Sequence, residues 1–272
     1  MSEIYNMTLD NMKFSYSSVT SFITCPYMFF LTYIQYEKRS SNFYADFGSF
    51  MHLVLEKYFT GELDIMELAS YYEEHYDENV KSDVPAYPVG IGDRYKADGM
   101  LFFENFDFNK DDYEVVFVED IIETTHNDIK LVVKPDLVLK DKKTGEYLLL
   151  DYKTSNPFSK DGKPDKKKIA DYRKQMYLYA YFINHNRDYK ISKIRLWFVR
   201  VNKFDEFDYV EEDAGDVVNW FFNGILNIKF EEEFPPCDTV KNKFFCNCLC
   251  SVANFCKYRP WLFTQNVVYC TS

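Results

Sequence analysis

The sequence predicts an α/β fold: a mixed central β-sheet flanked by helices, with a helical N-terminal part and a cysteine-rich C-terminal tail. Up to about residue 110, apolar residues recur mostly at helical spacing, and beyond it short β-branched and apolar runs alternate with helical patterns. A cluster of cysteines then follows the last helical pattern. The expected strands are Glu114–Glu123, Ile129–Lys140, Tyr147–Lys153 and Ile191–Val201.

Helices are expected where apolar residues repeat every three to four positions between capping and breaking residues. Ser15, Ser17 and Ser18 are candidate caps for the first helix, Gly61 ends the second, and Pro235-Pro236 follows the last. The expected helices are Tyr16–Tyr36, Phe47–Phe59, Ile65–Val80, Ala97–Phe106, Ile169–Asn184 and Asp216–Phe230. Pro85–Gly92 and Ser155–Lys167 are expected loops, and Asp141–Glu146 is an expected turn.

The length of 272 residues suits one domain. We divide it into a mainly helical part (1–110), an α/β catalytic core (111–233) and a metal-binding tail (234–272). The net charge of −11 counts against a simple DNA-coating protein, but not against an enzyme whose metal ions supply positive charge. The 26 Phe and 23 Tyr residues have two explanations, an AT-rich genome or platforms for unpaired bases.

The expected location is the cytoplasm. No apolar run approaches the 18 residues that a membrane span needs, and residues 1–10 carry no signal-peptide pattern. The seven cysteines are then not expected to form a disulfide framework, and metal binding is the better explanation for their spacing.

Two acids and a lysine form the most chemically informative cluster. Asp151 and Lys153 are two residues apart in an expected strand, so they face the same side. Asp136 is expected late in the preceding strand, close to Asp151 across a tight turn. Converging carboxylates suit Mg²⁺ or Mn²⁺, and a nearby lysine could orient an attacking water. The alternative is a strand-end acid paired with a surface lysine.

Further motifs follow in order along the chain. They are Cys25-Pro26 in the first helix, His52 after Gly48-Ser49-Phe50-Met51, D-Y-K-T at Asp151–Thr154, and Q-M-Y-L-Y at Gln175–Tyr179. Together they resemble the RecB-type branch of the PD-(D/E)XK nuclease superfamily, over most of the chain. The resemblance implies a restriction-endonuclease-like core. One departure is Val133-Lys134-Pro135 before Asp136, where the family often has an upstream glycine.

The resemblance also implies roles for individual residues. The implied ligands of the catalytic metal are His52, Glu119, Asp136 and Asp151. Lys153 would be the catalytic lysine, and Gln175 and Tyr179 would contact DNA and support the site. Asp120 and Glu123 compete with Glu119 for the same role.

The tail cysteines indicate a second metal site. Cys246, Cys248, Cys250 and Cys256 lie within eleven residues, a density typical of zinc or iron–sulfur ligation. Some RecB-type nucleases, including CRISPR-adaptation exonucleases and AddB-like subunits, hold a four-cysteine [4Fe–4S] cluster. That resemblance implies the ligands Cys25, Cys246, Cys250 and Cys256, with Cys248 as the alternative to Cys246 and one residue inserted relative to the family spacing. Zn²⁺ bound by the four tail cysteines is the rival, and Cys237 and Cys270 are expected to be free thiols.

One basic cluster lies beside the predicted site. It consists of Lys160, Lys163, Lys166, Lys167, Lys168, Arg173 and Lys174. These side chains either contact DNA phosphates without reading sequence or form a solvated loop.

The expected function is a metal-dependent DNA nuclease, most simply an exonuclease on single strands or duplex ends in recombination, repair, replication or CRISPR adaptation. Without a Walker A loop, it would act alone or with a separate helicase or recombination factor. Composition and size suggest a phage or other prokaryotic source. The alternatives are a non-cleaving DNA-binding or assembly subunit and a zinc-stabilised interaction protein.

Overall fold

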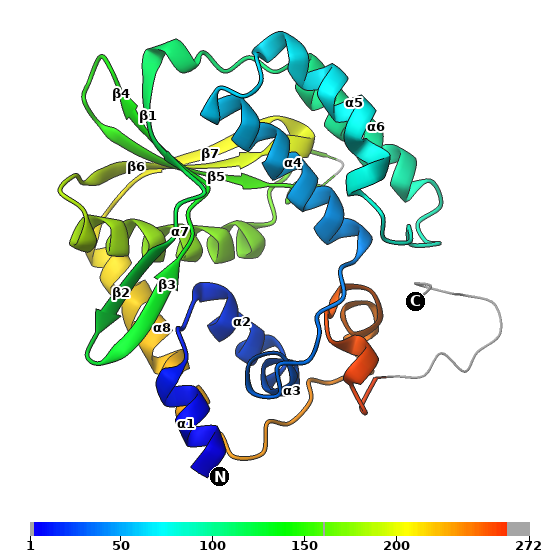
Figure 1. Ribbon diagram of the computed structural model, residues 1–272, viewed down its shortest axis with the longest axis vertical. Helices are drawn as coiled ribbons and strands as arrows, with labels where there is room; N and C mark the ends of the chain where they lie inside the picture. Colours follow the sequence, from blue (N-terminus) through cyan, green and yellow to red (C-terminus); the bar gives the residue numbers. More distant parts are fainter. Residues whose placement is uncertain (1–2, 160, 260–272) are drawn as a thin grey trace.

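A five-stranded mixed sheet forms the centre of the computed structural model, which describes residues 3–159 and 161–259 (Figure 1). Lys160 and Cys270 therefore lie outside the described residues. The strand order is β1-β4-β5-β6-β7. β5 and β6 are parallel and the other neighbours are antiparallel. The strands are β1 (Tyr113–Val118), β4 (Leu137–Asp141), β5 (Tyr147–Lys153), β6 (Ile191–Phe198) and β7 (Lys203–Asp208). The predicted α/β class is confirmed.

Helices cover both faces of this sheet (Figure 1). One face packs against α4 (Phe43–Thr60), α5 (Leu68–Asn79) and α6 (Ile91–Glu104). The other packs against α1 (Glu3–Asn11), α2 (Tyr16–Thr24), α3 (Pro26–Phe29), α7 (Lys166–Asn186) and α8 (Glu211–Phe230). β5 explains why two cores form: Leu148 and Leu150 enter the first and Leu149 enters the second. The continuous apolar run of this strand is thus buried on both faces.

The first predicted helix, Tyr16–Tyr36, is wrong as one continuous element. It breaks at Cys25, whose backbone is extended (φ −160°, ψ 102°), because the residue before a proline is disfavoured in the helical region. Pro26 then starts α3, and a π-helical turn follows at Phe30–Ile34. The break leaves Cys25 at the N-terminus of a helix.

Two predicted strands also divide, and both breaks lie beside the acids. Glu114–Glu123 separates into β1 and β2 (Ile122–His126), and Ile129–Lys140 into β3 (Ile129–Val133) and β4. β2 and β3 form their own antiparallel hairpin. Pro135 cannot donate a backbone hydrogen bond, and Glu119 has a left-handed backbone (φ 53°), so neither continues a strand.

The predicted place of Asp136 late in a strand is therefore wrong. It directly precedes β4, where Leu137 pairs with Leu150 in antiparallel register. Asp136 thus meets the end of β5 at the open end of the hairpin, away from the Asp141–Glu146 turn.

Other differences lie at element boundaries. The prediction missed α1 and β7, and α6 begins at Ile91, inside the predicted loop Pro85–Gly92. α7 and α8 each extend beyond the predicted ranges. Three short 3₁₀ turns are at Ile65–Glu67, Lys110–Asp112 and Val199–Val201, and the tail contains a π turn (Phe245–Leu249) and a 3₁₀ turn (Ala253–Phe255). Within the described ranges, no helix is long and apolar enough to cross a membrane.

Candidate active site

Helix α4 carries His52 to the end of β5. Asn42 caps its first turn and Gly61 ends it in a left-handed conformation. Gly48 lies one turn before His52, where an added Cβ would come within 3.3 Å of the Thr154 hydroxyl. The missing side chain therefore lets α4 approach the residue that follows β5.

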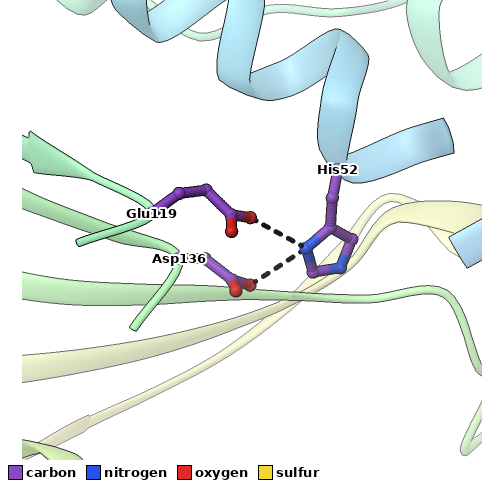
Figure 2. A group of neighbouring side chains, drawn as sticks. All are labelled: His52, Glu119 and Asp136. Atoms are coloured by element: carbon purple, nitrogen blue, oxygen red, sulfur yellow. Dashed lines mark ion pairs between the residues drawn. The ribbon is translucent and has the colours of Figure 1, made fainter. Parts of the chain in front are cut away.

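The hydrogen bond of His52 fixes the direction of its free nitrogen. Nε2 lies 3.1 Å from the backbone oxygen of Tyr152. Because a carbonyl can only accept, Nε2 carries a hydrogen, which leaves Nδ1 as the nitrogen available to a metal. Nδ1 faces two carboxylates, 3.7 Å from Glu119 Oε1 and 3.5 Å from Asp136 Oδ2 (Figure 2).

Backbone contacts hold the two acids together. The Tyr152 N–H donates to Asp136 Oδ2 at 2.8 Å, and the Glu119 N–H donates to the Asp136 carbonyl at 2.8 Å. The left-handed backbone of Glu119 costs energy for a residue with a side chain, and such strain concentrates at functional sites. Lys134 forms an ion pair with the other oxygen of Glu119.

The charges of these groups reinforce one another. Burial alone lowers the pKa of His52, but the charge of Asp136 and hydrogen bonds with Asp136 and Glu119 outweigh it and raise that pKa to about 10. Hydrogen bonding to His52 is the main cause that lowers the pKa of Glu119. Burial raises the pKa of Asp136, but the charge of His52 reverses the direction and lowers it overall. Without metal, the site is a protonated imidazole between two carboxylates.

These three side chains could hold a metal ion. One ligand atom from each of His52, Glu119 and Asp136 lies within 4.8 Å of the others. Two carboxylates and one imidazole fit a divalent cation such as Mg²⁺ or Mn²⁺. A cavity of about 440 Å³ opens on this group, with Ser49 and Glu56 also in its lining. A phosphate group could therefore reach the metal position from solvent.

Asp151 and Lys153 lie behind this group as a buried pair. Asp151 Oδ2 is 2.6 Å from Lys153 Nζ, and Asp151 is only 2% exposed. Burial, followed by the negative charge of Asp136, raises the pKa of Asp151 to about 6. Burial alone lowers the pKa of Lys153, but the carboxylates of Asp151 and Asp136 raise it overall, so this lysine stays charged.

Gln175 and Tyr179 connect to the site through Lys153. Lys153 Nζ donates to Gln175 Oε1 at 2.9 Å, and Gln175 Nε2 donates to the Tyr179 hydroxyl at 3.0 Å. Both side chains come from α7, four residues apart on one face. Because Tyr179 is 8% exposed, this geometry suits support of Lys153, and DNA contact by this pair stays a prediction.

The structure thus brings His52, Glu119 and Asp136 into one compact group, and the Asp151–Lys153 pair interacts electrostatically with Asp136 without being part of that group. The competing acids point elsewhere: Asp120 pairs with Arg187, and Glu123 pairs with Lys13.

Sequence reasoning missed Lys134 and Glu56. Glu56 had a signal, because it follows His52 by one helical turn. Lys134 had none, since its contact with Glu119 depends on two strand breaks that the sequence did not predict.

A second cluster joins the two ends of the described chain. Cys25 Sγ accepts backbone N–H groups from Met28 (3.4 Å) and Cys237 (3.3 Å). Cys237 Sγ also lies 3.8 Å from Cys246 Sγ. One small apolar cavity is lined by five free cysteines: Cys25, Cys237, Cys246, Cys250 and Cys256. Cys237 is a free thiol as predicted, but it belongs to this cluster.

The π turn in the tail accounts for the inserted residue. The Cys250 N–H donates to the Phe245 carbonyl at 2.9 Å, five residues back, so the turn holds one residue more than an α-helical turn. Cys246 and Cys250 can therefore share a site despite their unusual spacing. In tetrahedral zinc sites the sulfurs lie about 3.8 Å apart, given bonds of about 2.3 Å. Among the described free cysteines, no three sulfurs lie within 4.8 Å of one another. Cys248 is disulfide-bonded, so the predictions of Cys248 as the alternative ligand and of zinc bound by all four tail cysteines are wrong.

The fold and the site together define a class: an α/β protein with acids, a histidine and a lysine around a potential metal position at one end of a mixed sheet. The sequence-family model of the PD-(D/E)XK nuclease superfamily matches residues 13–261 of this chain. The chain belongs to this superfamily. Membership in this superfamily implies a metal-dependent nuclease.

Solved structures show similar chains at low identity. A putative exonuclease from Eubacterium rectale is 13% identical with a TM-score of 0.49, over 96% of this chain and 95% of that one. A protein called SSO0001 is 14% identical with a TM-score of 0.37, over 95% of this chain and 96% of that one. No match was found among curated proteins.

Proposed function

We propose that this protein is a Mg²⁺- or Mn²⁺-dependent exonuclease that hydrolyses phosphodiester bonds of single-stranded DNA or duplex ends. The observation that carries the proposal is the direction of His52 Nδ1 toward Glu119 and Asp136, with a charged Lys153 directly behind them. The pathway would be recombination, repair, replication or CRISPR adaptation, as for RecB-type relatives. A helicase or recombination factor would be the protein partner.

Each residue has a distinct task in this proposal. His52, Glu119 and Asp136 would hold the divalent ion, with Asp151 as a further ligand. The bound ion supplies the Lewis acidity that polarises the phosphate and lowers the pKa of a water. Lys153 donates hydrogen bonds that orient the attacking water. Gln175 fixes the direction of the Lys153 ammonium, and Tyr179 fixes Gln175.

The DNA would approach along the loop before α7. Among the predicted basic residues, Arg173 is held by two hydrogen bonds to Asp205, at 2.7 and 2.5 Å, so it is not free for phosphate. Lys163 and Lys168 line a second cavity that opens beside this loop. We therefore assign the phosphate contacts to the lysines rather than to Arg173. Such contacts would make binding salt-sensitive and independent of sequence.

We also propose that Cys25, Cys246, Cys250 and Cys256 hold a [4Fe–4S] cluster. Support comes from the five-thiol cavity, from the two N–H groups that face Cys25 Sγ, and from sulfurs spread more widely than a single zinc ion requires. The role would be structural, because the site closes a loop between the N-terminal and C-terminal segments. Zinc without iron or sulfide in anaerobically purified protein would overturn this part.

Cleavage of end-labelled DNA tests the main proposal. Wild type, Asp151→Ala and Lys153→Ala are purified anaerobically and incubated with single- and double-stranded DNA and Mn²⁺. We expect wild type to degrade DNA from its ends and both variants to lose at least about 100-fold in rate, as for loss of a residue that stabilises the transition state. Internal cleavage fragments would instead show that the protein is an endonuclease. A folded, metal-loaded wild type without activity would favour the non-cleaving DNA-binding subunit.

A further inference from the structure

Lys134 lies at the mouth of the metal position but has no part in the mechanism above. Its ammonium pairs with Oε2 of Glu119, while Oε1 of the same carboxylate faces His52 Nδ1. The Lys134 side chain is 54% exposed, and it lines the 440 Å³ cavity. It thus combines a contact to a proposed metal ligand with access to solvent.

Metal binding changes the charge balance around Lys134. A divalent ion bound by Glu119 would add positive charge beside Lys134. Glu119 then shares its charge with the ion and holds Lys134 less strongly. A phosphodiester carries negative charge and would offer the Lys134 ammonium a partner in place of Glu119. The flexible lysine side chain reaches the cavity from a residue just before Pro135.

We propose that Lys134 is a DNA-phosphate ligand that Glu119 holds until the divalent ion binds. Without metal, Lys134 neutralises Glu119 and competes with the ion for that carboxylate. With metal, its ammonium turns to a phosphate of the bound strand. The inference rests on the proposed function, because it requires the same metal position and a DNA substrate.

The test measures metal and DNA binding separately from cleavage. All proteins carry Lys153→Met to prevent hydrolysis, and Lys134→Met is compared with Lys134→Arg. Lys193→Met is the matched control, because Lys193 is also ion-paired, with Asp208, but lies near the start of β6 and outside the cavity. Calorimetry measures Mn²⁺ affinity. Fluorescence anisotropy measures binding of a single-stranded oligonucleotide at saturating Mn²⁺ over a series of salt concentrations.

We expect Lys134→Met to bind Mn²⁺ at least about threefold more tightly and DNA at least about threefold more weakly. The slope of log affinity against log salt should become shallower by about 0.7, the value for one lost phosphate contact on a single strand. Lys134→Arg should keep the slope, and Lys193→Met should change neither affinity.

Unchanged or weaker Mn²⁺ binding, or an unchanged salt slope, in Lys134→Met would overturn the proposal. Failure of the proposed nuclease function would appear elsewhere, in the cleavage assay described above, where wild-type protein with intact Lys153 would not degrade DNA.

Discussion

At the residue scale, one hydrogen bond determines what His52 can do. The Nε2–H of His52 donates a hydrogen bond to the Tyr152 carbonyl. Nδ1 must therefore hold either a proton between two carboxylates or a metal ion. The neighbouring Tyr152 N–H binds Asp136, so a single residue of β5 orients two members of the group. A metal that binds here must displace the proton from Nδ1, and metal affinity should therefore depend on pH.

We predict that Mn²⁺ affinity rises about tenfold per pH unit between pH 7 and 9. The pKa of His52 is raised to about 10, so the metal-free site holds its proton across this range and releases it on binding. Below pH 6 the slope should steepen, because Asp151, whose pKa is raised to about 6, must lose a second proton. Calorimetry at several pH values measures the slope, and His52→Gln should remove one proton from it. An affinity independent of pH would place the metal away from Nδ1.

Gln175 offers a second residue-scale prediction. Gln175→Leu removes an acceptor from the Lys153 ammonium, and a hydrogen bond to a charged group is worth about 1.5–3 kcal/mol. If that energy supports the reacting geometry, kcat should fall about 10- to 100-fold with KM little changed. Steady-state cleavage of end-labelled single strands measures both constants, and unfolding temperatures check the fold. A rise in KM at constant kcat would instead assign Gln175 to direct DNA contact.

At the element scale, the site is built from the ends of elements. β1 stops before Glu119, β4 starts after Asp136, and β5 ends at Lys153, so the functional side chains extend from one end of the sheet. The alternation of apolar residues predicted strands here, and the D-x-K spacing predicted that Asp151 and Lys153 adjoin. The sequence pattern did not predict the strand breaks at Glu119 and Pro135. The left-handed backbone of Glu119 depends on a tertiary contact, the hydrogen bond from its N–H to the Asp136 carbonyl.

A substitution at Gly48 would test how closely α4 must approach β5. Alanine favours a helix interior over glycine by about 1 kcal/mol, but its Cβ would meet Thr154 Oγ1 at 3.3 Å. We therefore expect Gly48→Ala to stabilise the Thr154→Ala protein by about 1 kcal/mol and to give wild type little or no gain. Urea unfolding of the double-mutant cycle measures this coupling. Equal gains in both backgrounds would show that the contact does not limit the approach of α4.

At the scale of the whole molecule, the tail docks on the N-terminal segment. The Tyr27 N–H donates to the Pro235 carbonyl (3.1 Å), and the Ser40 N–H donates to the Ser251 carbonyl (2.7 Å). In Figure 1 the tail lies beside α3, far in sequence but near in space. The family resemblance implied a shared metal site for Cys25 and the tail cysteines. It could not predict that Cys237 lies there too, because that requires the path after Pro236.

Metal loss should therefore loosen the tail before it disturbs the sheet. The tail meets the N-terminal segment through backbone bonds, thiols and partly exposed aromatic rings such as Tyr27 with Tyr258, whereas β5 is buried between two cores. In hydrogen exchange, we expect Cys250→Ser to speed exchange at the amides of Ser40 and Cys237 at least about tenfold and to leave Leu149 unchanged. Asp151→Ala is the control, because it removes a group of the catalytic site and should leave both tail-contact amides as in wild type. If Leu149 and the tail contacts accelerated together in Cys250→Ser, the cysteine site would stabilise the whole fold as one cooperative unit.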